Sequence, residues 1–485
     1  MKKHKRSTFS GKLGFVLSAA GASVGLGNIW RFPYLAAKYG GGIFLLVYII
    51  LALTFGYTLI MAETSLGRMT RKSPVGAFES FGNSRFISIG GWINAIIPIL
   101  IVPYYSVIGG WVIKYLIEYF AGHSKALAGD AYFTTFISNG WSTEICFIIF
   151  TLFTLGIIYA GVRNGIERVS KFMMPILIVL SLIIAVYSVT RPGAIEGVKY
   201  FLVPNFDHFS WMTVVSAMGQ MFYSLSIAMG ILITFGSYMK KDISIEDSTR
   251  NVEVFDTAIA IMAGLMIIPA VFAFSGGNPD TLQAGPALMF ITIPKVFENM
   301  GLGTAIGILF FLLVLFAALT SSIALTESAV STFEDEIGWS RKKSTVLVGV
   351  IMIVLGSLSS LGYGPLAFVK IIGMQFLDFF DFLTNSVMMP IAALMTSLLV
   401  ARVVGVKKIE EEIIHGESAF RRKKIFAVMI KYLCPIFVLI ILISLMKWKN
   451  LLKDIRVKDI NFICCLIVQC NFINIINQNL FFNIL

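Results

Sequence analysis

The feature that most constrains this chain is a succession of apolar segments joined by short polar links. A helix that crosses a bilayer takes roughly 20 mostly apolar residues. Of the 485 residues, 57% are hydrophobic and only 14% are charged. A soluble domain with this balance would expose a mostly apolar surface and aggregate. The sequence therefore predicts one all-α membrane domain and no soluble domain of useful size.

The apolar segments predict about eleven transmembrane helices in a single domain at residues 1–446. The expected helices cover about 12–38, 42–66, 87–120, 144–160, 167–189, 211–239, 252–274, 303–336, 343–361, 376–400 and 425–446. Residues 447–485 break the pattern, because they contain many asparagines, which are costly in lipid. They predict an atypical tail, either a poor twelfth helix or, as we favour, a non-native extension.

The distribution of charge predicts the orientation of the helices. The formal net charge is +12, and basic residues recur in alternate links, at 2–6, 68–72, 163–168, 240–241, 341–343 and 402–408. Links rich in lysine and arginine stay in the cytoplasm. We therefore expect a multi-pass protein of the plasma (inner) membrane with a cytoplasmic N-terminus. Membrane lipid then explains the positive charge without a nucleic acid partner.

Signatures of enzymes do not occur in the sequence. We find no GxSxG, HExxH or P-loop pattern. The five cysteines and four histidines form no CxxC-type or other metal-ligand pair. The sequence therefore predicts neither catalytic residues nor a metal centre built on these side chains.

Two of the expected helices carry small residues near their middles. The first reads GASVGLGN over Gly21–Asn28, and the sixth reads SLSIAMG over Ser224–Gly230. Glycine inside a helix costs about 1 kcal/mol relative to alanine, and unwound backbone at membrane depth must face a cavity, an ion or a ligand. Close packing of small residues explains either stretch alone equally well. A pair of such stretches, five helices apart, is typical of the binding site of an inverted-repeat transporter.

The first stretch also carries a long motif. Residues Gly25–Tyr34 read GLGNIWRFPY and are followed by YGGG at Tyr39–Gly42. This run resembles the first-helix motif of the neurotransmitter:sodium symporter family. The resemblance continues with GQMFYSLS at Gly219–Ser226 and LTSSIA at Leu319–Ala324.

The resemblance extends from Ser7 to about Met446, as in the eleven-helix bacterial amino-acid transporters with the leucine-transporter fold. It implies an inverted five-plus-five repeat, with halves at about 12–190 and 211–400 and helices one and six broken in mid-membrane. An eleventh helix would follow at about 425–446.

The resemblance also implies two sodium sites. The first would use the Ser23 carbonyl, Asn28, Ser224, Asp256 and the carboxylate of the substrate. The second would use the carbonyls of Gly21, Val24 and Ala317 with the hydroxyls of Thr320 and Ser321. Sodium is a hard cation that takes oxygen ligands, as other hard cations do. Without the resemblance, Thr320 and Ser321 would be interpreted as hydroxyls bonded back to the preceding helical turn.

Asp256 departs from the pattern of many family members, which have asparagine there and need chloride nearby. A carboxylate can balance the cations itself, and its protonation can reset the empty carrier. The position one turn later is Ala260, which is neutral. We therefore predict that transport does not need chloride. The alternative is that Asp256 is only a helix-end aspartate at the cytoplasmic start of helix seven.

Gly25 indicates the class of substrate. Family members that carry biogenic amines have aspartate at this position, whereas glycine offers no counter-charge. The resemblance instead implies that a substrate carboxylate lies on the backbone amides of Leu26 and Gly27, beside Gly25, with the Tyr105 hydroxyl as a second donor. The remaining expected pocket residues are mainly apolar and carry no acid or base: Ser23, Ile101, Ile108, Tyr223, Ser224, Ser226, Met229, Ser321 and Leu325. A hydrophobic or aromatic amino acid fits this lining.

Two gates are implied by the same resemblance. The outer gate would pair Arg31 with Asp381 above Tyr105 and Tyr223, where Tyr223 replaces the usual phenylalanine and Asp378 could substitute for Asp381. The inner gate would pair Arg6 with Asp335, supported by Phe9 and Tyr238, where Phe9 replaces the usual tryptophan. Without the resemblance, Arg6 and Asp335 would be interpreted as solvated charges.

The sequence therefore predicts sodium-coupled symport of a neutral amino acid into the cell by alternating access. A non-transporting amino-acid receptor and a sodium-coupled carrier of another small carboxylate are the alternatives that stay open. A channel is less consistent with two broken helices, which suit an occluded site. The particular amino acid and the oligomeric state do not follow from the sequence.

Overall fold

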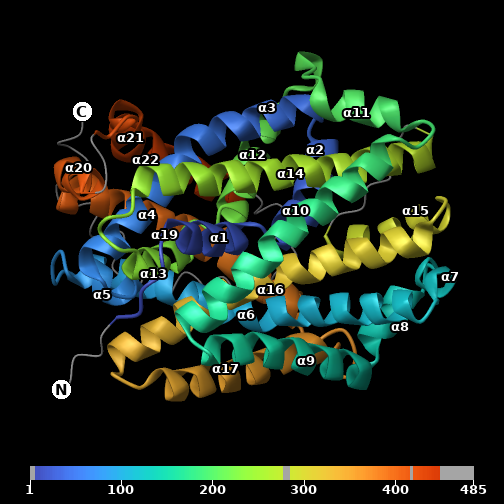
Figure 1. Cartoon of the computed structure of the whole chain (residues 1–485), viewed down its shortest axis with the longest axis horizontal. Helices are drawn as coiled ribbons and strands as arrows, with labels where there is room; N and C mark the ends of the chain where they lie inside the picture. Colours follow the sequence, from blue (N-terminus) through green and yellow to red (C-terminus); the bar gives the residue numbers. More distant parts are fainter. Residues whose placement is uncertain (1–5, 277–284, 416–418, 448–485) are drawn as a thin grey trace.

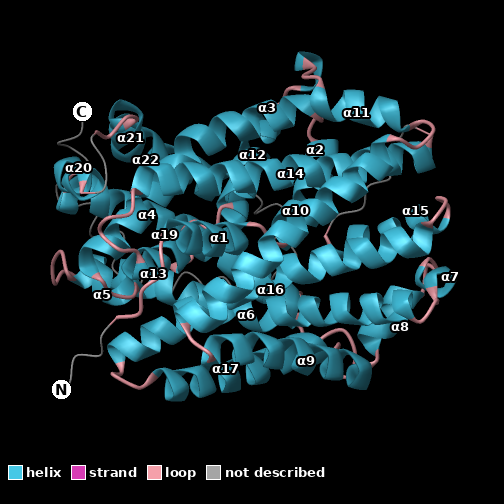
Figure 2. Cartoon of the chain, in the orientation of Figure 1, coloured by secondary structure: helices cyan, strands magenta, loops and turns pink. Residues whose placement is uncertain are grey.

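The computed structural model describes residues 6–276, 285–415 and 419–447. In these residues all regular structure is helical, and the β-structure consists of two isolated bridges, Gly41–Pro204 and Ile371–Met374 (Figure 2). Most long helices run roughly along one direction and form a bundle (Figure 1). The predicted all-α membrane fold is therefore confirmed. The atypical tail that we predicted lies, from residue 448 onward, outside the described residues.

The first five predicted spans are observed as helices, several of them in pieces. In order they are α1 (Lys12–Ser23), η1 (Gly27–Arg31) and α2 (Phe32–Lys38); α3 (Gly42–Leu51), η2 (Ala52–Gly56) and α4 (Tyr57–Thr70); α6 (Arg85–Phe120); α9 (Gly140–Tyr159); and η3 (Val162–Glu167) with α10 (Arg168–Val189).

The other predicted spans follow in the same way. They are α12 (Trp211–Ser224) with α13 (Ile231–Tyr238); α14 (Ile245–Ser275); α16 (Gly303–Glu336); α17 (Arg341–Leu361); α18 (Phe376–Asp381), η7 (Phe382–Met388), α19 (Met389–Leu398) and η8 (Leu399–Val404); and α21 (Lys423–Val428), η9 (Met429–Leu433) and α22 (Cys434–Lys447).

Short helices occupy several of the links between spans. They are α5 (Pro74–Glu79), α7 (Ser124–Leu127), α8 (Tyr132–Ser138), α11 (Ala194–Leu202), η4 (Phe206–His208), η6 (Leu288–Thr292), α15 (Ile293–Glu298) and α20 (Val406–Ile414). The apolar pattern did not predict these helices, because they are too short to cross a bilayer.

Local chemistry explains where several long helices begin. Side-chain oxygens of Ser84, Asn139, Ser210 and Ser244 accept hydrogen bonds from the first-turn amides of α6, α9, α12 and α14. Helix α14 begins before the predicted residue 252, because its capped first turn carries Glu246 and Asp247. Acidic residues stabilise a helix N-terminus. They are not apolar, so the apolar pattern did not include this first turn.

Nine helices in the described residues are long and apolar enough to cross a membrane. A tenth span is formed by Lys12–Ser23 with Gly27–Lys38, a pair of helices bent by 52°. In the sixth predicted span, α12 and α13 are separated by Leu225–Gly230, and neither is long enough to cross alone. The predicted total of about eleven spans and its inverted repeat therefore stay predictions.

Candidate functional site

The first helix is interrupted between Ser23, where α1 ends, and Gly27, where η1 begins. The interruption leaves carbonyl groups of Gly21, Ala22 and Val24 facing α16. The Ser321 hydroxyl oxygen lies 3.4, 3.1 and 3.4 Å from these three oxygens. One hydroxyl proton can satisfy only one of them well. The cluster therefore has more acceptor oxygens than donors, as a site for a cation would.

Thr320 brings a second hydroxyl to the same place. Its Oγ1 lies 3.1 Å from the Ala317 carbonyl oxygen. A Cβ atom added to Gly21 would lie 3.2 Å from the Thr320 Cβ, so α1 and α16 are in close contact here. The groups predicted for the second sodium site are thus brought together. Thr320 also bonds back to Phe316, as the alternative interpretation expected.

The predicted first sodium site is organised around Asp256, a fully buried residue of α14. Asn28 Nδ2 donates to its Oδ1 over 2.8 Å, and the Ser224 hydroxyl lies 2.8 and 3.0 Å from its two oxygens. The Tyr48 hydroxyl donates to Oδ2 over 2.9 Å. Among the described residues, no basic side chain forms an ion pair with Asp256. A buried carboxylate is costly unless a positive charge accompanies it.

The alternative interpretation of Asp256 as a helix-end residue is wrong. Helix α14 begins at Ile245, so Asp256 lies well inside the helix. Ser23, the remaining predicted ligand residue, is buried at the end of α1, and its hydroxyl bonds to the Ala19 carbonyl over 3.1 Å. Tyr48 was not predicted, because one tyrosine in an apolar segment does not reveal its partner.

The second interruption has a strained backbone. Between α12 and α13, Ser226, Ala228 and Gly230 have φ angles of 52°, 60° and 68°. Left-handed backbone costs non-glycine residues about 1–2 kcal/mol each. The buried Glu63 of α4 accepts a 2.8 Å hydrogen bond from the Ala228 amide. Glu63 therefore holds the unwound segment.

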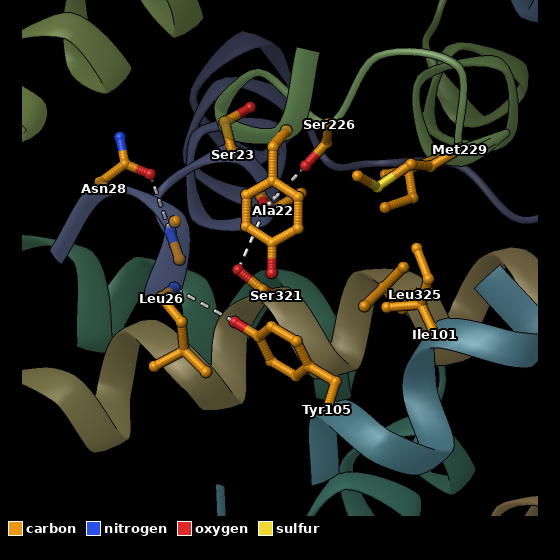
Figure 3. Close-up of a pocket in the computed structure, with 14 residues that line it drawn as sticks. Ala22, Ser23, Leu26, Asn28, Ile101, Tyr105, Ser226, Met229, Ser321 and Leu325 are labelled. Carbon is orange, nitrogen blue, oxygen red and sulfur yellow. Dashed lines mark hydrogen bonds between the residues drawn. The ribbon is translucent and has the colours of Figure 1, made fainter. Parts of the chain in front are cut away.

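The two interruptions meet at a single cavity (Figure 3). The Ser226 hydroxyl donates to the Ala22 carbonyl over 3.0 Å, which ties one break to the other. All predicted pocket residues line the cavity except Ile108 and Ser224. Ala22, Asn28 and Ile231 line it as well, although they were not predicted for it. Its lining contains no Asp, Glu, Lys, Arg or His side chain.

One wall of the cavity is polar and crowded. The Leu26 amide donates to the Tyr105 hydroxyl oxygen over 3.3 Å, as Figure 3 shows. A Cβ atom added to Gly25 would lie 2.5 Å from Ser321 Oγ and 3.1 Å from the Tyr105 hydroxyl oxygen. Only glycine fits here without displacing its neighbours. The opposite wall is formed by Ile101, Met229 and Leu325 (Figure 3).

The residues predicted for the inner gate are in contact. Arg6 Nη1 lies 2.6 Å from Asp335 Oδ1, and the guanidinium lies 4.9 Å from the ring centre of Tyr238. The other Asp335 oxygen accepts from the Ser73 amide over 2.6 Å. The Phe9 ring packs edge-on against Tyr238, with 6.0 Å between the ring centres. The residues predicted for the inner gate are therefore brought together.

The residues predicted for the outer gate are not paired directly. The Arg31 guanidinium lies over the Tyr223 ring, 5.2 Å from its centre. Asp381 instead accepts from Asn385 over 2.6 Å and from Tyr104 over 3.3 Å. Among the described residues, Arg31 has no carboxylate within 4 Å. Asp378 bonds to the Tyr363 hydroxyl over 2.9 Å. A polar contact between Arg31 and Asp381 would need a bridging water, because the charged groups of the two side chains are not within 4 Å of each other.

The chain is similar to known proteins over most of its length. The model of the sodium:neurotransmitter symporter family matches residues 6–147 and 135–455. The chain is 34% identical over 451 residues to the uncharacterized sodium-dependent transporter YhdH of Bacillus subtilis (strain 168), covering 92% of this chain and 99% of that protein. It is 32% identical over 454 residues to an uncharacterized sodium-dependent transporter of Haemophilus influenzae, covering 91% and 98%.

A solved structure is similar over the same extent. The crystal structure of MhsT in complex with L-phenylalanine superposes with a TM-score of 0.82 at 36% identity. The match covers 91% of this chain and 100% of that one.

Proposed function

The chain belongs to the sodium:neurotransmitter symporter family and is a sodium-coupled membrane transporter; from that premise we propose that it carries a neutral, hydrophobic or aromatic amino acid into the cell with two sodium ions and without chloride. The observation that carries the proposal is the cavity between the two helix breaks. It offers backbone and hydroxyl groups at one wall, apolar side chains at the other, and no charged side chain.

The polar wall suits the α-carboxylate of an amino acid. The Leu26 amide and the Tyr105 hydroxyl are hydrogen-bond donors beside the break, and the helix that begins at Gly27 places its N-terminus there. A charged substrate side chain would find no partner at Ile101, Met229 or Leu325, and burying it would be costly. The structurally similar MhsT was solved with L-phenylalanine, which is a neutral aromatic amino acid.

Asp256 supports independence from chloride. Its carboxylate is fully buried among Asn28, Ser224 and Tyr48, all of them neutral. A sodium ion at this place would neutralise it, so no mobile anion is needed to balance the charge. The paired residues of the inner gate and the unpaired residues of the outer gate support alternating access, because the two gates differ in one structure.

The substrate class can be tested by sodium-dependent binding of labelled phenylalanine to purified protein, with competition by other amino acids. We expect leucine and tryptophan to compete and lysine, glutamate and amines without a carboxylate to fail. Gly25→Ala should weaken binding by about 5- to 150-fold, because overpacking costs about 1–3 kcal/mol. Gly156→Ala is the matched control, since nothing lies within 4 Å of a Cβ atom there.

Three outcomes would contradict the proposal. Competition by lysine or glutamate as strong as by leucine would exclude an uncharged side-chain site. Equal losses in both glycine variants would show that the break at Gly25 does not shape the pocket. Binding without exchange of internal for external amino acid in vesicles would indicate a receptor in place of a carrier.

A further inference from the structure

The link between α10 and α12 exposes an unusual apolar surface. Every residue from Leu202 to Met212 is exposed, and Phe206 and Trp211 are 70% and 61% exposed. We define the α11–α12 patch as Leu202, Val203, Phe206, Phe209, Trp211 and Met212. An apolar patch of this kind is unfavourable in water and usually marks contact with another surface.

The position of the patch indicates which surface covers it. It joins two consecutive spans, α10 and α12, and Trp211 is the first residue of α12. Helix α11 lies beside α14 and α3, in the half of the molecule away from the N-terminus (Figure 1). Aromatic residues mixed with polar ones, at the ends of spans, are typical of the boundary between lipid and water.

A cavity of about 300 Å³ lies beside the patch. It is lined by Gly40, Lys199, Tyr200, Val203, Asn205 and His208. Its two sides are tied together by the Gly41–Pro204 bridge and by a 2.6 Å hydrogen bond from the Tyr200 hydroxyl to the Ala37 carbonyl. A Cβ atom added to Gly41 would lie 2.1 Å from the Tyr200 carbonyl oxygen, so glycine permits this close approach. The cavity is therefore formed without a ligand.

The chemistry of the lining selects an anion. Lys199 and His208 are the ionisable groups with basic nitrogens, and no carboxylate lines the cavity. Lys199 pairs with Glu196 over 3.1 Å, but both side chains are more than 60% exposed, so this pair is weak and exchangeable. Asp207 is the other acid nearby. Its backbone amide donates a hydrogen bond to the side-chain oxygen of Asn205. A phosphate would supply acceptor oxygens for both basic side chains.

We propose that the α11–α12 patch lies in the lipid–water interface and that the adjoining cavity binds the phosphate group of an anionic phospholipid through Lys199 and His208. The acyl chains of the bound lipid lie against the apolar patch, and its headgroup reaches the cavity. Inorganic phosphate shares the headgroup chemistry but would make no contact with the patch.

Quenching of Trp211 fluorescence by brominated lipids tests both the interfacial position of the patch and the binding of an anionic phospholipid. The chain has seven tryptophans, so the Trp211 signal is the difference between the unmodified protein and Trp211→Phe, each in phosphatidylcholine vesicles. Brominated phosphatidylcholine should quench this signal. Brominated phosphatidylglycerol is added as a minor component. Its quenching of the Trp211 signal should correspond to an enrichment of about fivefold beside Trp211, which is the effect of one basic side chain near an anionic surface.

Lys199→Ala combined with His208→Ala should abolish the preference for phosphatidylglycerol and leave quenching by phosphatidylcholine unchanged. Lys125→Ala, which removes an exposed charge from α7, is the control and should keep the preference. A Trp211 signal that neither lipid quenches would overturn the interfacial position. A preference for phosphatidylglycerol that stays unchanged in the double variant would overturn the lipid assignment.

Discussion

The two predicted sodium sites lie at the same helix break but use different kinds of oxygen. One is organised around the buried carboxylate of Asp256, with Asn28, Ser224 and Tyr48 bonded to it. The other consists of neutral groups only, the backbone carbonyls and the hydroxyls of Thr320 and Ser321. A full charge dominates binding in a buried place, whereas neutral oxygens act through their number and position. The first site should therefore depend on one residue and the second on several.

The largest expected effect is that of Asp256→Asn. Removing one partner of a buried charge pair costs about 3–5 kcal/mol, so the apparent sodium affinity should fall about 100-fold or more in chloride-free medium. Chloride should restore part of the activity of this variant, because a mobile anion can replace the lost charge. The measurement is sodium-dependent uptake in gluconate and in chloride. Asp130→Asn, an exposed acid on the link before α8, is the control.

If Asp256→Asn keeps its sodium affinity without chloride, the first sodium site does not depend on a charged carboxylate, and the contrast with the second site is wrong. In that case the buried carboxylate must be neutral in the working protein.

A smaller effect is expected for Ser321→Ala. A single neutral hydrogen bond contributes about 1 kcal/mol, so sodium affinity should fall about fivefold, and chloride should not restore it. Thr396→Val is the control, because the Thr396 hydroxyl is buried like that of Ser321 but bonds back along its own helix and not to the first helix break. Rescue of Ser321→Ala by chloride would contradict the neutral character of the second site.

Tyr48→Phe further tests the contrast between the first and the second sodium site. It removes one hydrogen bond to Asp256, and a loss of about fivefold in sodium affinity is expected. The loss should disappear when Asp256 is already asparagine, because both residues then belong to one network. A double-mutant cycle with Ser321→Ala should be additive. Additivity between Tyr48 and Asp256 would show that the hydrogen bond between them has no energetic role.

The smallest expected effect is that of Arg6→Ala at the inner gate. Arg6 and Asp335 are partly exposed, and such pairs contribute about 1 kcal/mol or less. The variant should open the inner end at most about fivefold more often and weaken both sodium sites to the same extent. Accessibility of an introduced Ser23→Cys to a thiol reagent from the inner side measures this. A selective effect on one site would contradict a purely gating role.

The local motifs were predicted well because they depend on neighbours in sequence. The two helix breaks were predicted from the sequences of Gly21–Asn28 and Ser224–Gly230, because glycine and short polar residues disfavour helix wherever they occur. Helix α16 was predicted at the observed residues. The beginning of α14 was missed, since it is polar.

Contacts between distant residues could not be derived in the same way. Tyr48 and Glu63 each lie in one apolar span, and only the packing of α3 and α4 against α14 and the second break reveals their partners. The direct pairing of Arg31 with Asp381 was expected from resemblance, but a gate has two states and the sequence does not say which is populated.

The central claim is sodium-coupled transport of a neutral amino acid in which Asp256 takes the place of chloride. The most direct test is uptake of labelled phenylalanine and leucine into proteoliposomes, with sodium or potassium outside and with chloride or gluconate as the anion. The account predicts concentrative uptake that needs sodium and is equal in both anions. Sodium-driven uptake that stops in gluconate, or no sodium-driven uptake of any neutral amino acid by folded protein, would contradict it.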